Sequence, residues 1–168
     1  MTTPREDLIS WLRDAYAMEG QATQLLETQI ERLDNYPEAL PRLRQHLQET
    51  REQQAMVEQC LARLDADPSA LKESAMKFAA TMQGMLHAMS SDEVLKHALA
   101  SHAFEQFEAG CYRSLTAAAE TVGEPEIART CEQIMRQEQE MAHWVWEQLP
   151  HMTEKYLRRA ATGAEAKR

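Results

Sequence analysis

Apolar residues recur at alternating spacings of three and four along most of the chain, which is the period of an amphipathic helix. Helix start signals divide this pattern. Thr3 with Glu6 and Ser90 with Glu93 both read as capping boxes, and Pro37 and Pro125 stand where further helices would begin. The pattern predicts long helices over about residues 4–33, 37–64, 90–123 and 125–149, a shorter helix over 67–89, and a short one over 154–159.

Loop lengths predict how these helices are connected. Helices one and two, and the last two long helices, are joined by short loops, so each pair forms an antiparallel hairpin. The segment 65–91 is long enough to carry the chain along the bundle between the hairpins. One long crossover is typical of ferritin-like bundles. We therefore predict a single ferritin-like helical domain over residues 1–161 and a disordered tail over 162–168.

Composition supports an all-α fold and narrows the function. Only 5 Gly and 6 Pro occur in 168 residues, too few for the many turns of an all-β fold. The net charge of −9 argues against binding to nucleic acid, which needs a basic surface. The first residues, MTTPREDLIS, do not resemble a signal peptide, and no stretch approaches a membrane span. We expect a cytoplasmic protein without membrane or nucleic-acid partners.

Glutamates interrupt three of the apolar stripes at mid-helix. Glu19 lies on the stripe of the first helix, Glu105 and Glu108 on that of the fourth, and Glu138 on that of the fifth. The second helix is less regular. Its stripe runs Leu40, Leu43, Leu47, Thr50, Gln54, Val57, Leu61 and Leu64, and Glu49 lies at its edge, on the side of His46 and Gln53.

The spacing of these carboxylates suggests an internal repeat. Glu19 and Glu49 are 30 residues apart, and so are Glu108 and Glu138. A shift of 89 residues superimposes the two pairs and aligns Leu26 with Leu115. The sequence therefore resembles a duplicated helical hairpin with one carboxylate in the middle of each helix.

Four carboxylates in one buried layer need neutralisation, because an unpaired buried charge costs several kcal/mol. The carboxylates can be protonated, paired with Lys or Arg, or bound to a cation. No Lys or Arg lies on the stripes near them. A pair of divalent metal ions fits best, since such sites in bundles use carboxylates and histidines of facing helices. Alternatively, each single glutamate can lie at the boundary of the core with its carboxylate in water. His46 can likewise be a surface histidine, or one whose hydrogen bonds are satisfied without a metal. His143 has the Glu-x-x-His spacing with Glu140, which itself lies off the stripe.

The chain resembles the YciE/YciF family, ferritin-like proteins of unknown function (DUF892). The similarity covers roughly residues 5–160, is closest to the YciE branch, and rests on WLRDAYAMEGQA, HLQETREQ, FEQFEAGCYRSL and EQEMAHW. It implies a ferritin-like bundle, usually a dimer, with a dinuclear metal centre. The family pattern places ligands at Glu19, Glu49, Glu108 and Glu138, with Glu105 and His46 nearby. One departure stands out: Glu52 and Met141 hold the two positions where ferritin-like oxidases have histidine.

The leading hypothesis is a stress-related metal-binding protein that holds iron or manganese and acts in metal sequestration or in peroxide and oxygen handling. His143, with His46 and Glu105, is a candidate to compensate for the missing histidines. The alternative is a non-enzymatic helical dimer that acts through partner binding and has a vestigial metal site. Candidate exposed apolar residues for a homodimer interface are Trp11, Phe78, Met82 and Met85.

Overall fold

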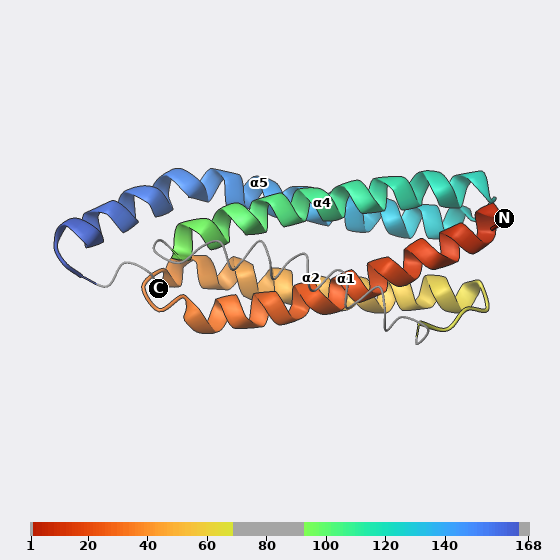
Figure 1. The fold of residues 1–168 in the computed structure, drawn as a ribbon, viewed down its shortest axis with the longest axis horizontal. Coiled ribbons are helices and arrows are strands. Elements are labelled where there is room, and N and C mark those ends of the chain that lie inside the picture. The colour runs from red at the N-terminus through yellow and green to blue at the C-terminus, as the bar shows by residue number, and fades with distance from the viewer. Residues whose placement is uncertain (1, 69–92, 165–168) are drawn as a thin grey trace.

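The computed structural model describes residues 2–68 and 93–164, and all regular structure within these ranges is helical (Figure 1). The elements are α1 (Pro4–Arg32), the 3-10 helix η1 (Pro37–Ala39), α2 (Leu40–Arg63), α4 (Glu93–Thr121) and α5 (Pro125–Ala161). The predicted crossover helix lies outside the described residues, as do Phe78, Met82 and Met85. In the described ranges, no helix combines the length and apolar character needed to cross a bilayer.

The helices form two antiparallel hairpins, α1 with α2 and α4 with α5, and each hairpin packs on the other. Between the hairpins, α1 contacts α4 and α2 contacts α5. In Figure 1, α2 ends at one end of the bundle and α4 begins at the other. This topology confirms the predicted all-α bundle with a crossover between its second and third helices.

Local signals in the sequence determine the helix ends. The predicted capping box forms at α1, where the backbone N–H of Glu6 donates to Thr3 Oγ1 and the Glu6 carboxylate accepts from the backbone N–H of Thr3. At the end of α4, Gly123 adopts a φ of +78°, which glycine tolerates without strain. The N–H of Glu124 then donates to the carbonyl of Ala119, closing a Schellman motif.

Two apolar clusters build the core, one toward each end of the bundle. The first contains Leu8, Leu12, Val57, Leu61, Leu115, Ile127 and Ile134 among others, and the second contains Leu26, Leu33, Leu43, Val94, Met141, Val145 and Met152 among others. On every helix, the residues between the two clusters include buried polar side chains. The bundle therefore consists of two apolar halves with a polar layer between them.

The predicted end of the last helix before Pro150 is wrong, because α5 continues through Pro150 to Ala161. Proline removes one backbone hydrogen bond from a helix interior and crowds the preceding turn. Long-range contacts of the following turns offset this cost. Met152 is buried in the second apolar cluster, Lys155 Nζ donates to Glu38 Oε1 at 2.8 Å, and Arg159 Nη2 donates to Asn35 Oδ1 at 2.6 Å.

Replacing Pro150 with alanine tests this balance. Because Pro150→Ala restores the missing N–H and keeps the contacts beyond it, we expect the free energy of unfolding to rise by about 1 to 3 kcal/mol. Urea unfolding followed by circular dichroism measures the change. Pro125→Ala is the control, since Pro125 occupies the first turn of the same helix, where its missing N–H costs little. Unchanged or lower stability of Pro150→Ala would contradict the explanation.

Candidate metal centre

The polar layer collects buried side chains from all four long helices. Glu19 comes from α1, His46 and Gln53 from α2, Glu105 and Glu108 from α4, and Glu138 from α5, and each is at most 2% exposed. Their helices carry apolar residues on the same face above and below the layer, and the packing of those residues turns the polar side chains inward. The apolar residues therefore fix the rotation of each helix about its axis, and this rotation places the polar side chains in one layer.

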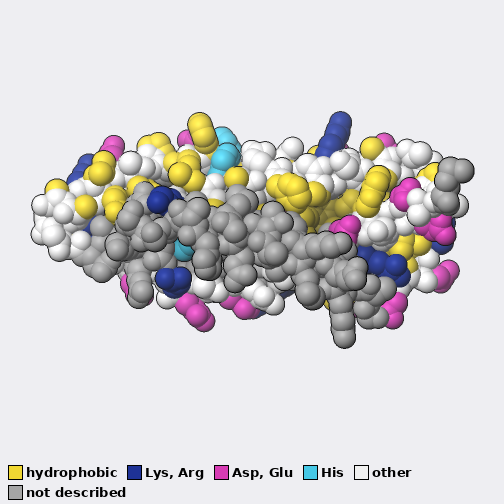
Figure 2. Space-filling model, in the orientation of Figure 1, with side chains coloured by type: hydrophobic (Ala, Val, Ile, Leu, Met, Phe, Trp, Pro, Cys, Tyr) yellow, Lys and Arg dark blue, Asp and Glu magenta, His cyan; other side chains and the backbone are white. Residues whose placement is uncertain are grey.

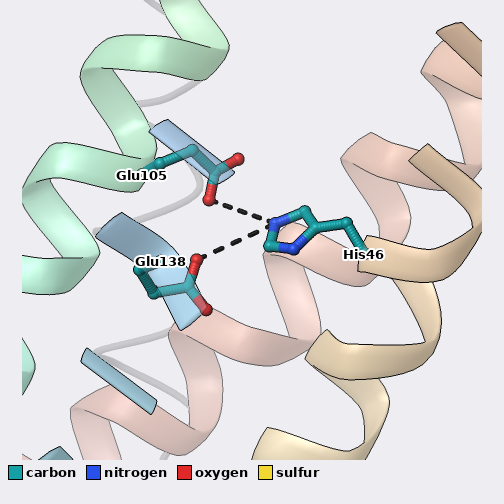
Figure 3. A group of neighbouring side chains, drawn as sticks. All are labelled: His46, Glu105 and Glu138. Atoms are coloured by element: carbon teal, nitrogen blue, oxygen red, sulfur yellow. Dashed lines mark hydrogen bonds and ion pairs between the residues drawn. The ribbon is translucent and has the colours of Figure 1, made fainter. Parts of the chain in front are cut away.

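His46 lies at the centre of the layer and connects three helices (Figure 3). Its Nε2 atom is 3.1 Å from Glu105 Oε2 and 3.8 Å from Glu138 Oε2. One ligand atom from each of these three residues lies within 4.8 Å of the others. The Oγ1 of Thr50 donates to the backbone carbonyl of His46, one helical turn away. An imidazole and two carboxylates therefore converge from α2, α4 and α5.

Neutral groups hold three of the carboxylates in place. Gln53 Nε2 donates to Glu138 Oε1, and Ser101 Oγ donates to Glu105 Oε1 at 3.3 Å. The hydroxyl of the fully buried Tyr112 donates to Glu19 Oε1. These contacts orient the carboxylates and leave other oxygens of the same groups facing the interior.

Several buried oxygens of the layer have no hydrogen-bond donor among the described residues. They are Glu19 Oε2, Glu108 Oε1, Glu138 Oε2 and the side-chain oxygen of Gln53. Buried acceptors without a partner are uncommon and point to a missing ion, water or proton. Here they gather in the same layer as the cluster around His46.

Burial changes the ionisation of the carboxylates. It raises the pKa of Glu19 to about 8, although the hydrogen bond from Tyr112 opposes this. Burial raises the pKa of Glu108 well above its ordinary value, and the nearby charges of Glu19 and Glu138 add to the effect. Burial and the charge of Glu105 likewise raise the pKa of Glu138 well above its ordinary value. Without a cation, the layer therefore keeps protons that free glutamates release.

His46 and Glu105 form the charged pair of the layer. Burial lowers the pKa of His46, but the charge of Glu105 and its hydrogen bond outweigh burial and raise this pKa to about 9. Burial acts to raise the pKa of Glu105, but the charge of His46 reverses the balance and lowers it. An imidazolium thus occupies the position where a cation would neutralise the same carboxylates.

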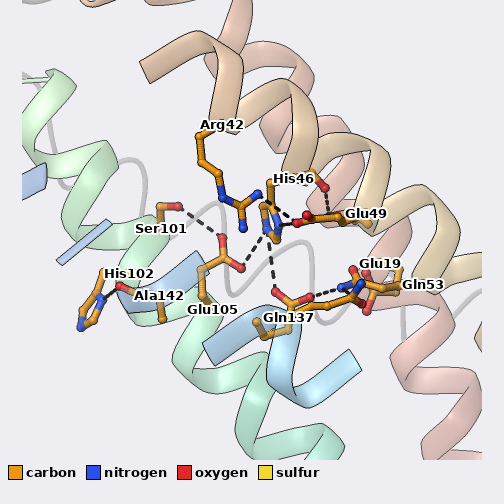
Figure 4. A network of polar contacts seen from close by, with 12 residues as sticks. Glu19, Arg42, His46, Glu49, Gln53, Ser101, His102, Glu105, Gln137 and Ala142 are labelled. Atoms are coloured by element: carbon orange, nitrogen blue, oxygen red, sulfur yellow. Dashed lines mark hydrogen bonds and ion pairs between the residues drawn. The ribbon is translucent and has the colours of Figure 1, made fainter. Parts of the chain in front are cut away.

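Glu49 differs from the other predicted ligands, because its side chain is 18% exposed. Arg42 Nη1 lies 2.9 Å from Glu49 Oε2, and His46 Nδ1 lies 3.3 Å from the same oxygen (Figure 4). The hydrogen bond with His46, followed by Arg42, lowers the pKa of Glu49 to about 2. No Lys or Arg lies on the predicted stripes near the carboxylates, but Arg42 reaches Glu49 from outside its stripe. Arg42 precedes it by two helical turns, and its long side chain spans them.

The buried face of α2 keeps most of the predicted stripe and also takes in the side of His46, Gln53 and Cys60. The buried members of the stripe are Leu43, Thr50, Val57, Leu61 and Leu64. Gln54, by contrast, is only partly buried and donates to the backbone carbonyl of Tyr16 at 3.1 Å. The structure does not bring His143 to the layer, since its side chain is exposed on α5. Five predicted ligand candidates therefore gather in the interior, namely Glu19, His46, Glu105, Glu108 and Glu138, with Glu49 at the edge.

Sequence reasoning did not assign site roles to Gln53, Tyr112 and Arg42. Gln53 follows His46 by seven residues, so both lie on one helix face, and this spacing was a usable signal. Tyr112 occupies an apolar stripe position, and no sequence signal tells a packing tyrosine from one that donates to a carboxylate.

The donor set of imidazole nitrogen and carboxylate oxygens suits iron and manganese.

Comparisons with known proteins agree with this fold. The family "Domain of unknown function (DUF892)" matches residues 3–158. A protein from Xanthomonas campestris pv. campestris, with 37% identity, is similar over 95% of this chain and 99% of its own at a TM-score of 0.81.

More distant solved structures share the bundle. YcfI from Rhodopseudomonas palustris has 25% identity and a TM-score of 0.73 over 86% of this chain and 94% of its own. The E. coli stress protein YciF has 19% identity and a TM-score of 0.76 over 92% and 99%. The family match over most of the chain confirms the predicted membership: the protein belongs to the DUF892 family, which includes YciF.

Proposed function

We propose that this protein is a ferritin-like metal-binding protein whose polar layer holds iron or manganese. The observation that carries the proposal is that Glu19 Oε2, Glu108 Oε1 and Glu138 Oε2, each in a fully buried side chain, have no hydrogen-bond donor among the described residues. A divalent cation supplies the positive charge and the coordination that these oxygens lack. Protonation alone neutralises the charge but adds buried O–H donors, each of which also needs a partner.

Two metal positions account for the whole layer. His46, Glu105 and Glu138 would hold the first, because their ligand atoms already converge. Glu19 and Glu108 would hold the second. The charges of Glu19 and Glu138 both act on Glu108, which supports a site in the same part of the layer. We therefore propose a dinuclear carboxylate centre with Glu49 at its edge.

The residues around the centre favour metal sequestration over rapid redox turnover. Iron or manganese in such a site supplies one-electron chemistry toward oxygen and peroxide. Met141, three residues after Glu138, is fully buried in the second apolar cluster, and Glu52 is exposed. Neither provides the histidine that ferritin-like oxidases use, so His46 is the one histidine among the described residues that would contribute a nitrogen ligand. The name of the related YciF supports a role under stress, and the three free cysteines are consistent with a cytoplasmic location.

An exposed apolar face supports the second candidate function, a helical dimer. Leu99 and Phe107 on α4 are 52% and 53% exposed, and the space beyond Gly110 is open. Between Ala98 and Tyr112, no charged residue of α4 is exposed. Hydrophobic side chains are visible over α4 and α5 in Figure 2. We propose that this face joins two copies of the chain in a homodimer.

Metal content tests the centre directly. After anaerobic loading with Fe(II) or Mn(II) and removal of free ions, the parent protein should retain metal. Glu138→Gln should lower the affinity more than tenfold, because Glu138 is one of the three residues whose ligand atoms converge. Glu140→Gln is the matched control, since Glu140 is exposed on the same helix. A parent without metal, or Glu138→Gln with full metal content, would refute the proposed function.

The buried charge makes a second prediction for the metal-free protein. The pKa of Glu108 is raised above its ordinary 4.5, so the folded protein keeps a proton that the unfolded chain loses as pH rises. The stability contribution of this group is therefore full at low pH and falls as pH rises above 4.5. Glu108→Gln removes this penalty and should raise the melting temperature by several degrees at pH 8 and by much less at pH 5.

Glu120→Gln is the control for this measurement, because Glu120 is exposed on the same helix and its removal changes the net charge equally. Melting is followed by circular dichroism in the presence of a chelator. Equal effects of Glu108→Gln at the two pH values would show that burial does not perturb Glu108.

The proposed homodimer is tested by mass. Light scattering should give twice the chain mass of 19.2 kDa at micromolar concentration. Leu99→Lys should shift the protein toward the monomer, because a buried ammonium in the contact has no partner. Leu157→Lys introduces the same charge at an equally exposed leucine on α5 and should leave the mass unchanged. A parent that scatters as a monomer rules out this interface.

A further inference from the structure

Three partly exposed side chains connect the buried layer with the surface. Ser101 donates to Glu105, Gln137 accepts from Gln53, and Glu49 contacts His46. Of these three, Glu49 is the one that carries a negative charge and attracts a cation from water. Glu49 contacts the centre through His46. The Nδ1 atom of His46 lies 3.3 Å from Glu49, and its Nε2 atom lies 3.1 Å from Glu105.

Among the described residues, the hydrogen bonds of Glu49 come from its own helix. Arg42 Nη1 donates to Oε2 at 2.9 Å, and Gln45 Nε2 donates to Oε1 at 2.8 Å. Arg42, Gln45 and His46 all belong to α2. Because these bonds do not join helices, the carboxylate of Glu49 can exchange Arg42 for another cation without disturbing the packing of the bundle.

A second route to the centre is far less suitable for an ion. A cavity of about 20 Å³ at the second apolar cluster reaches Ser101, but its walls are mainly apolar side chains such as Leu33, Leu43, Ala98 and Val145. A hydrated divalent cation would lose its water there without replacement ligands. From α2 to α4, by contrast, Glu49, His46 and Glu105 offer ligand atoms at successive short distances.

We propose that Glu49 is the entrance for divalent cations to the buried centre and that Arg42 holds this entrance closed. The inference rests on the proposed metal-binding function. An arriving cation must displace the guanidinium from Glu49 Oε2 before it reaches His46 and Glu105. The positive charge of Arg42 also repels the ion at this point. Arg42 therefore controls the rate of metal entry. It does not change the amount of metal that is bound at equilibrium.

The rate of iron uptake tests the entrance. Metal-free protein is mixed anaerobically with Fe(II), free Fe(II) is trapped at timed intervals with a colorimetric chelator, and the final iron content is measured by elemental analysis. Arg42→Met keeps most of the apolar stem and removes the charge. We expect this variant to take up iron at least threefold faster than the parent and to reach the same final content.

Two further variants control for charge and for the fold. Arg51→Met removes the same charge from the same helix, where Arg51 pairs with Glu27 at an exposed site, and should load at the rate of the parent. Arg42→Lys keeps a positive charge beside Glu49 and should also remain within twofold of the parent. Parent-like uptake by Arg42→Met, equal acceleration by Arg51→Met or Arg42→Lys, or a lower final iron content of Arg42→Met would each overturn the entrance. A parent that binds no iron would instead refute the metal-binding function, and the entrance with it.

Discussion

The neutralisation of four carboxylates in one layer is the constraint around which this bundle is built. Glu19, Glu105, Glu108 and Glu138 come from three helices and are all removed from water. Ionised together, they would destabilise the fold by several kcal/mol. One imidazole, three neutral hydrogen-bond donors and retained protons reduce the repulsion between these carboxylates. Several carboxylate oxygens still have no hydrogen-bond donor among the described residues. The two apolar clusters must supply the stability that offsets such a layer.

The sequence predicted those parts of the site that interrupt a regular apolar stripe. On α1, α4 and α5 a single glutamate or a close pair stands among apolar residues, so the phase of the helix is certain. On α2, polar residues occupy the buried face itself, and the apolar pattern alone indicates Gln54 in place of Gln53. Arg42 could not be found in this way, because it lies two turns from Glu49 and reaches it only through the length of its side chain.

The fold followed from signals that act over a few residues. The capping box at Thr3 and the glycine at 123 determine helix ends through their own backbone contacts, and both were read correctly. Pro150 is the exception. Its local preference to end a helix is outweighed by contacts of Lys155 and Arg159 with residues more than 100 positions earlier in the chain. No local rule contains that information, since the contacts exist only after the bundle has formed.

The division of the core affects how the bundle unfolds. Each apolar cluster draws on all four long helices but occupies only part of their length, and the layer between them contributes repulsion along with its hydrogen bonds. Cooperativity depends on favourable contacts that run continuously from one end of a domain to the other. In the metal-free protein the two clusters are joined by the helix backbones and by the few polar contacts of the layer, which favours opening of one end before the other. A cation that ties α1, α2, α4 and α5 together at mid-length would merge the two ends into one cooperative unit.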